Sequence, residues 1–231
     1  MQIFGMEKLS LVDYDGKVSA TLFTASCNFR CGFCHNSDLV VMANALTPID
    51  NDEIFAYLKK RAGILDGVCI SGGEPTMQND LPQFIEKIKN LGYSVKLDTN
   101  GTNPDMVKSL KENGLIDYFA IDIKNCKDKY SEIIGINNFN TEKVEKTVDY
   151  LISQCENYEF RTTLISQYHG KEEMKKIAEW IKGANKYCLQ QFKENEHCIN
   201  AKNLSAVPKE VANEFLEIVS PFVKKAILRG Y

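Results

Sequence analysis

The sequence lacks the features of a membrane or nucleic-acid-binding protein. No apolar run approaches the roughly 18 to 20 residues that span a bilayer. The 28 Lys and Arg residues are outnumbered by 31 Asp and Glu, and the formal net charge of −3 offers no basic field to a phosphate backbone. Glu7 and Asp13 interrupt the apolar core that a secretory signal would need. We therefore expect a cytoplasmic protein that binds neither a membrane nor nucleic acid.

The chain also lacks internal repeats, low-complexity tracts and Pro- or Ser-rich linkers. At 231 residues, with 44% hydrophobic and 26% charged residues, it has the size and composition of one large globular domain. We expect a single domain over residues 1–231, with a core at about 18–195 and a helical C-terminal extension at about 205–231.

Short β-branched or aromatic runs alternate with amphipathic helical patterns. The helical patterns lie around residues 54–58, 81–88, 106–110, 144–152 and 174–181. The predicted strands are Ala20–Thr24, Gly67–Ser71, Ser94–Asp98, Tyr118–Ile123, Tyr158–Thr163 and Tyr187–Phe192. Strands separated by helices pair in parallel through right-handed crossovers, and six repeats are too few to close a barrel of eight. The pattern predicts an α/β fold: an open, partial (β/α)6 barrel with a mostly parallel sheet and its ligands at the carboxyl ends of the strands.

The eight cysteines are unevenly distributed. Five are scattered, whereas Cys27, Cys31 and Cys34 form a C-x3-C-x2-C arrangement directly after the first predicted strand. Three closely spaced thiolates can hold three irons of a cubane cluster that normally takes four cysteines, which leaves one iron open for chemistry. A zinc knuckle is the alternative, but its fourth ligand would have to be His35, whose position next to Cys34 makes joint ligation of one metal awkward.

This cysteine motif, with Phe33 before its last cysteine, resembles the signature of the radical S-adenosylmethionine (SAM) superfamily. The resemblance implies a radical SAM domain with a [4Fe–4S] cluster on Cys27, Cys31 and Cys34 that cleaves SAM reductively. It also places Phe33 near the adenine of SAM.

A glycine-rich segment, Gly72-Gly73-Glu74-Pro75, follows the second predicted strand. Paired glycines let a backbone approach a ligand closely, and Glu74 adds a carboxylate. Alone, this segment could be an ordinary strand-to-helix turn. The resemblance implies that Gly72, Gly73 and Glu74 bind the amino group of SAM.

Charged and polar residues end the next two predicted strands, at Asp98-Thr99 and at Asp122-Ile123-Lys124. Side chains alternate along a strand, so Asp122 and Lys124 should point the same way and could orient the charged ends of SAM, although they could instead be a surface pair. These segments resemble activases of glycyl radical enzymes, which implies a monovalent cation beside SAM at Asp98, Thr99 and Asp122, and a contact from Lys124 to the cofactor.

Arg161, within a predicted strand, is a further candidate for the site, or else an arginine paired at the sheet surface. His169, Gln190 and Gln191 are weaker candidates whose roles are not legible from the sequence.

The motif Cys34-His35-Asn36, the D-x-K strand and the C-terminal Ile227-Leu228-Arg229-Gly230 resemble activating proteins of anaerobic ribonucleoside-triphosphate reductase. The resemblance implies hydrogen abstraction from a glycine of that partner enzyme, with electrons from a flavodoxin- or ferredoxin-type reductant. The alternatives are an activase of pyruvate formate-lyase or another glycyl radical enzyme, a small radical SAM enzyme acting on a small molecule, and a non-catalytic metal-binding or electron-carrier module.

Overall fold

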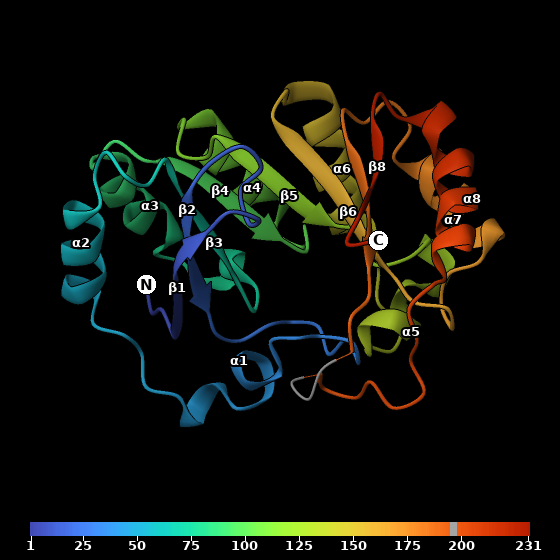
Figure 1. Ribbon diagram of the computed structural model, residues 1–231, viewed down its shortest axis with the longest axis horizontal. Coiled ribbons are helices and arrows are strands. Elements are labelled where there is room, and N and C mark those ends of the chain that lie inside the picture. Colours follow the sequence, from blue (N-terminus) through green and yellow to red (C-terminus); the bar gives the residue numbers. More distant parts are fainter. Residues whose placement is uncertain (195–197) are drawn as a thin grey trace. The chain divides into compact units, whose positions relative to one another are not determined.

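The computed structural model describes residues 1–194 and 198–231, and within them the chain forms an α/β fold (Figure 1). The strands are β1 (Gly5–Ser10), β2 (Ser19–Thr24), β3 (Gly67–Gly72), β4 (Ser94–Thr99), β5 (Tyr118–Asp122), β6 (Tyr158–Leu164), β7 (Tyr187–Gln191) and β8 (Ala226–Arg229). The α-helices are α1 (Ser37–Val41), α2 (Asn51–Lys60), α3 (Leu81–Lys89), α4 (Pro104–Glu112), α5 (Tyr130–Ile134), α6 (Glu142–Gln154), α7 (Lys171–Trp180) and α8 (Lys209–Val219).

By its contacts the chain divides into two compact units. Unit 1 comprises Met1–Asn28, Asp38–Thr99 and Asn103–Phe119, and unit 2 comprises Phe29–Ser37, Asn100–Thr102 and Ala120–Tyr231. The segment that carries the three cysteines therefore begins in unit 1, with Cys27, and continues in unit 2, with Cys31 and Cys34.

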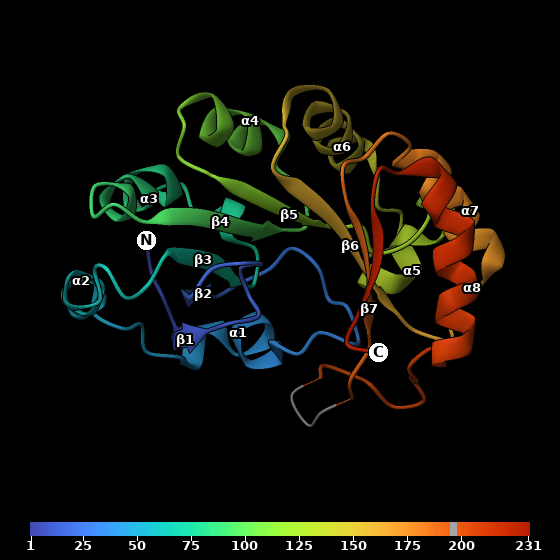
Figure 2. The same ribbon diagram turned by 45° about the horizontal axis from the view of Figure 1, so that its top comes forward.

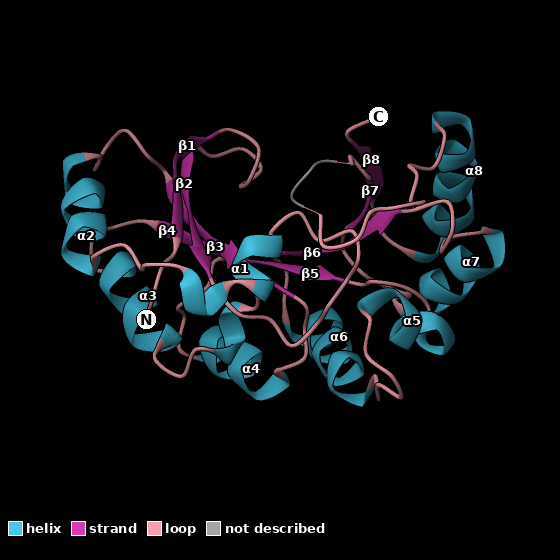
Figure 3. Ribbon diagram, turned by 90° about the horizontal axis from the view of Figure 1, so that it is seen from below, coloured by secondary structure: helices cyan, strands magenta, loops and turns pink. Residues whose placement is uncertain are grey.

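Unit 1 is built on strands β1–β4. β1 pairs antiparallel with β2, whereas β2, β3 and β4 are parallel, with Thr24 opposite Gly72 at the end of the β2–β3 ladder. Helices α2, α3 and α4 lie on one side of these strands (Figure 3). They bury apolar residues spaced three and four apart, as Leu81, Phe84 and Ile88 of α3 do. This packing leaves the carboxyl ends of the parallel strands to carry the polar loops.

Unit 2 contains strands β6, β7 and β8, which pair in parallel, together with helices α5 to α8. Helices α7 and α8 lie side by side along these strands (Figure 2). Thr162 of β6 and Tyr187 of β7 share a buried hydrogen bond of 2.7 Å, while Glu159 and Arg161 alternate with them and lie on the opposite face of β6. One face of β6 thus carries the buried Tyr158, Phe160, Thr162 and Leu164, and the other carries Glu159 and Arg161.

The predicted fold class is confirmed. The six predicted strands correspond to β2–β7, and the five predicted helical patterns to α2, α3, α4, α6 and α7. Within the described residues the strand order runs linearly from β1 to β8, so the mostly parallel sheet is not closed.

Two strands were not predicted, and one prediction is corrected. β1 is an antiparallel strand at the start of the chain, and β8 lies in the C-terminal part that was expected to be helical. That part contains helix α8, but Ala226–Arg229 extends beside β7 and satisfies its backbone there. None of the helices in the described ranges is both long and apolar enough to cross a bilayer.

Candidate active site

In unit 1, the glycine loop (residues 72–75) is bonded to the segment that leads into Cys27. The N–H of Gly73 donates to Thr24 O at 2.9 Å, and the N–H of Glu74 donates to Ser26 O at 2.8 Å. A β-carbon on Gly72 would lie 2.3 Å from Thr24 O, and one on Gly73 would lie 2.0 Å from Ser26 O. Both glycines are therefore required by the approach of one chain segment to another, a role that their sequence pattern did not reveal.

Ser26, the residue before Cys27, has a left-handed backbone with φ of 67°. Such a conformation is strained for a residue with a β-carbon and persists only where its surroundings hold it. Here the holding contacts are the bond from Glu74 and a 2.7 Å bond from Ser26 N to Leu39 O. The backbone entering the cysteine motif is thus fixed on both sides.

Glu74 is fully buried, and its carboxylate has internal partners. Its Oε1 accepts from the N–H of Thr76 at 3.0 Å, from the Thr76 hydroxyl at 2.6 Å and from the Thr99 hydroxyl at 2.6 Å. A buried carboxylate is stable in a protein only when it is bonded in this way. The hydrogen bond from the Thr99 hydroxyl to the Glu74 carboxylate therefore connects the glycine loop to the end of β4.

Asp98, also at the end of β4, has a partner that the sequence analysis missed. Lys96 is buried, and its Nζ lies 2.8 Å from Asp98 Oδ1 and 2.6 Å from Asp13 O. Ser71 donates its hydroxyl to Asp98 Oδ2 at 3.2 Å. This pair could have been predicted from the sequence, because residues two apart on a strand share a face and Lys96 lies two residues before Asp98.

In unit 2, Asp122 is held between two cations. Its Oδ2 lies 2.9 Å from Lys124 Nζ, and its Oδ1 accepts from Arg161 Nε at 2.8 Å. Burial acts to raise the pKa of Asp122, but Arg161 and Lys124 outweigh it and hold that pKa well below its usual range. Burial acts to lower the pKa of Lys124, and the Asp122 carboxylate reverses this, so the pKa is raised. Both groups are ionised at neutral pH.

The predicted site residues of unit 2 come together. The Nζ of Lys124 lies 5.6 Å from the centre of the Phe33 ring, within range of a cation–π interaction. Phe33 and Cys31 are buried, and the N–H of Cys34 donates to Cys31 O at 3.0 Å in a tight turn. The aromatic position of the cysteine motif is therefore packed against the lysine of the D-x-K strand, and Arg161 joins the same group through Asp122.

Two distant segments anchor the part of the cysteine loop in unit 2. The N–H of Arg30 donates to Ile134 O, and the N–H of Asn200 donates to Gly32 O, both at 2.8 Å. Cys198, one of the five cysteines outside the motif, lies with its Sγ 3.8 Å from Phe33 O. These anchors come from α5 and from the segment before α8, and no local sequence signal announced them.

The three cysteines fit an iron–sulfur cluster by the chemistry of their donors. All three lie on one eight-residue segment and none is in a disulfide, and thiolates are the ligands of such clusters. Across residues 1–194 and 198–231, no three His, Cys, Asp or Glu side chains converge on one metal-ion position. A cubane makes no such demand, because each thiolate binds a different iron. Burial raises the pKa of Cys34 although Lys124 acts to lower it, so bound metal would be needed to hold it as a thiolate.

The sequence also did not reveal a second charged cluster on β6, which is centred on Glu159. Glu159 is buried, and Arg229 of β8 binds it through two nitrogen–oxygen contacts of 3.0 Å while Lys186 Nζ lies 2.7 Å from Oε2. Burial acts to raise the pKa of Glu159, and Arg229 and Lys186 outweigh this and lower it. Arg229, singled out in the C-terminal motif, thus fixes β8 to β6. Gln190 lies in register between Thr163 and Arg229.

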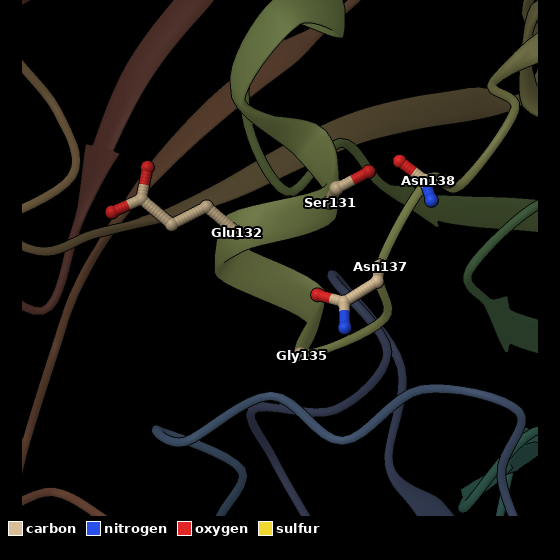
Figure 4. Close-up of a pocket in the computed structure, with 5 residues that line it drawn as sticks. All are labelled: Ser131, Glu132, Gly135, Asn137 and Asn138. Atoms are coloured by element: carbon tan, nitrogen blue, oxygen red, sulfur yellow. The ribbon is translucent and has the colours of Figure 1, made fainter.

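A polar pocket of about 650 Å³ lies beside α5 in unit 2 (Figure 4). Ser131 and Glu132 line it from α5, and Asn137 and Asn138 from the segment that follows. None of the predicted site residues lines this pocket. A β-carbon on Gly135, which also lines it, would lie 2.7 Å from Arg30 O, so its wall contacts the cysteine loop.

We expect Asp122→Asn to destabilise the protein in a pH-dependent way. The change removes the carboxylate that Lys124 and Arg161 share. The Asp122 side chain is 29% exposed, so water screens part of the effect, and we expect a loss of roughly 2 kcal/mol in the free energy of unfolding at neutral pH. The folded pKa of Asp122 lies below the unfolded value of about 3.9, so the carboxylate stabilises the fold above about pH 4 and ceases to do so as the pH falls through the folded value. Urea unfolding, measured from neutral to acidic pH, should show that the free energies of unfolding of wild type and variant approach each other as the pH falls below about 4.

The matched control is Asp149→Asn, at an exposed position on α6. It should leave the free energy of unfolding unchanged at every pH. An Asp122→Asn protein as stable as wild type at neutral pH would contradict the structure.

Comparison with known proteins connects these residues to one family. The model of the radical SAM superfamily matches residues 21–181. A Methanocaldococcus jannaschii protein, named provisionally as a glycyl-radical enzyme activating enzyme, is 32% identical over an alignment of length 238. The alignment covers 98% of this chain and 95% of that protein. A Thermococcus kodakarensis protein, also named provisionally, as a GTP 3′,8-cyclase, is 32% identical over 133 residues. The match covers 55% of this chain and 42% of that protein.

Among solved structures, a domain of pyruvate-formate lyase-activating enzyme from Bacteroides vulgatus matches with a TM-score of 0.59, at 19% identity over 71% of this chain and 99% of that one. At this identity the likeness shows the fold alone. The family match spans more than half of the chain and includes the cysteine motif, the glycine loop and the D-x-K strand. These three motifs lie within residues 21–181, and the chain belongs to the radical SAM superfamily of enzymes.

Proposed function

We propose that the protein is an activase of a glycyl radical enzyme. Cys27, Cys31 and Cys34 hold a [4Fe–4S] cluster, and SAM is the cosubstrate. The observation that carries the proposal is the packing of Phe33, within the cysteine motif, against Lys124, whose ammonium is bound to Asp122. The full-length relative named for glycyl-radical enzyme activation supports the class of reaction.

When bound, a reduced cluster supplies the electron that splits SAM into methionine and the 5′-deoxyadenosyl radical. The chain's own residues bind and orient. The main chain of Gly72, Gly73 and Glu74 binds the amino group of SAM, on a loop that the Glu74 carboxylate fixes to Thr76 and Thr99.

The charged group in unit 2 supplies further proposed contacts to the cosubstrate. Lys124 contacts SAM, and Asp122, itself bound by Arg161, holds the lysine in place. Phe33 offers an apolar face near the adenine. An ammonium fixed in this way can bind a carboxylate by a charge-assisted hydrogen bond without first losing rotamer freedom.

A monovalent cation at Asp98, Thr99 and Asp122 completes the proposed site. Both carboxylates already have cationic partners, Lys96 for Asp98 and Lys124 with Arg161 for Asp122. A bound cation would therefore share these oxygens with the protein's own ammonium and guanidinium groups.

The proposed partner is anaerobic ribonucleoside-triphosphate reductase, from which the enzyme would abstract a hydrogen at the Cα of one glycine. A flavodoxin- or ferredoxin-type protein would supply the electron. We place this reaction in the cytoplasm, in a single radical SAM domain of residues 1–231. An open sheet suits a macromolecular substrate, because one side remains accessible to a backbone loop.

A small-molecule substrate is the second candidate. The match to a protein named for GTP cyclisation favours it, but that match covers only about half of this chain. Activation of pyruvate formate-lyase or of another glycyl radical enzyme would use the same chemistry with a different partner.

The test is anaerobic reconstitution with iron and sulfide, followed by addition of dithionite, SAM and the purified reductase. We expect a glycyl radical in the EPR spectrum of the reductase and formation of 5′-deoxyadenosine. A radical on pyruvate formate-lyase instead would change the partner. Turnover that depends on a small substrate alone would replace the proposal, and absence of SAM cleavage from a cluster-loaded protein would overturn it.

A further inference from the structure

His169, whose role the sequence left open, is a buried residue bonded to the main chain of Lys124. It is 4% exposed and lies in the turn after β6. Its Nε2 is 3.0 Å from Lys124 O, and its Nδ1 is 3.0 Å from the N–H of Ile165. Nδ1 also lies 3.3 Å from Ile165 O, a longer contact than the 3.0 Å contact from the N–H of Ile165. Because Lys124 O only accepts and the shorter contact to Nδ1 comes from a donor, we assign His169 as neutral, with its proton on Nε2. Burial, which lowers its pKa, keeps it so.

The same turn binds the residue after Lys124. Asn125 donates its side-chain N–H to Tyr168 O at 3.0 Å and accepts from the N–H of Cys126 at 2.7 Å. On the other side of Lys124, the N–H of Ile123 donates to Arg161 O at 2.8 Å. The backbone around Lys124 is therefore held by β6 and by the turn that follows it.

We propose that His169 is a positioning residue for Lys124. Fixing the carbonyl of Lys124 fixes the start of a flexible side chain whose ammonium must lie between Asp122 and Phe33. Removing the hydrogen-bond partner that orients a metal ligand typically costs about 10- to 100-fold in affinity, and we take the lower end of that range for a partner that orients a lysine. This inference rests on the proposed function, in which Lys124 contacts SAM.

Two conservative substitutions separate the two hydrogen bonds of His169. The amide nitrogen of glutamine reaches the position of Nε2, so His169→Gln can keep the donor to Lys124 O. The amide oxygen of asparagine reaches only the position of Nδ1, so His169→Asn keeps the acceptor for Ile165 and loses the bond to Lys124. Each variant loses one hydrogen bond, so we expect both to lose a similar free energy of unfolding. A difference between them in SAM binding then reports on which bond was lost.

The measurement is the dissociation constant for SAM, taken by equilibrium dialysis on anaerobic, cluster-loaded protein without reductant. We expect His169→Asn to weaken SAM binding by about tenfold and His169→Gln to stay within about twofold of wild type. Hydrogen exchange at the Asn125 amide should accelerate in the asparagine variant only. In a Lys124→Ala background the further change His169→Asn should leave SAM affinity unaltered, because the group being positioned is gone.

Equal loss of SAM affinity in both variants, in step with their stability, would overturn the proposal and leave His169 a structural residue. Unchanged affinity in both would overturn it as well. These outcomes differ from failure of the proposed function, in which the wild-type, cluster-loaded protein itself would neither bind nor cleave SAM.

Discussion

Cys31→Ala is expected to abolish both the visible absorbance of the cluster and the cleavage of SAM, while the protein stays folded. Removing one of three thiolates leaves a cubane with two protein ligands, too few to hold it in place. SAM cleavage should fall to the background of the cluster-free protein. Absorbance and iron content after anaerobic reconstitution, with 5′-deoxyadenosine measured by chromatography, check this.

The fold should survive because main-chain hydrogen bonds anchor the loop of Cys31. The N–H of Cys34 bonds to the carbonyl of Cys31, and neighbouring main-chain bonds anchor Arg30 and Gly32. Alanine keeps every one of these bonds, so the free energy of unfolding of the cluster-free protein should change by no more than about 1 kcal/mol.

Cys155→Ala is the matched control. Cys155 is 7% exposed, close to the 6% of Cys31, and it follows α6 outside the cysteine motif. This variant should keep its cluster and its activity. A Cys31→Ala protein that still binds four irons and cleaves SAM would contradict the assignment of ligands.

Gly73→Ala is expected to have the largest effect on stability. The new β-carbon would lie 2.0 Å from Ser26 O and 2.7 Å from its carbonyl carbon, and both belong to backbone. The loop cannot yield without losing the bonds from Gly73 N to Thr24 O and from Glu74 N to Ser26 O. We expect a loss of about 3 kcal/mol in the free energy of unfolding, measured by urea denaturation of the cluster-free protein.

SAM binding should be lost as well, because the displaced segment carries both Cys27 and the glycine loop. Gly5→Ala is the control: neither glycine has a positive φ, and a β-carbon on Gly5 would meet nothing nearer than Phe23 Cδ2 at 3.5 Å. It should unfold like wild type. If Gly73→Ala matched Gly5→Ala in stability, the close approach of the glycine loop to Ser26 would be wrong.

The two strand-end aspartates show that the charges of the site are balanced within each unit. Asp98 is bound to Lys96 two residues before it, and Asp122 to Lys124 two residues after it. Lys96 and Asp98 share one face of β4 through the alternation of side chains. Lys124 lies two residues past Asp122, the last residue of β5, and its ammonium still reaches that carboxylate. Each carboxylate thus has a cationic partner from its own unit, and for Asp122 Arg161 and Lys124 hold the pKa well below its usual range.

The sequence by itself determined the fold class and the local motifs. Helical and strand periodicities predicted β2–β7 and five of the helices, because each pattern is written within one element. The cysteine motif, the glycine loop and the D-x-K strand were also legible, since each is contiguous. Alternation along a strand correctly placed Asp122 and Lys124 on one face.

The tertiary structure decided every interaction between residues far apart in the chain. Arg229 binds Glu159, His169 binds the carbonyl of Lys124, and Asn200 anchors Gly32. Strand β8 likewise became visible only beside β7. The physical reason is that periodicity reports which face of an element is buried, whereas the partner across that face depends on strand register and on where each loop returns.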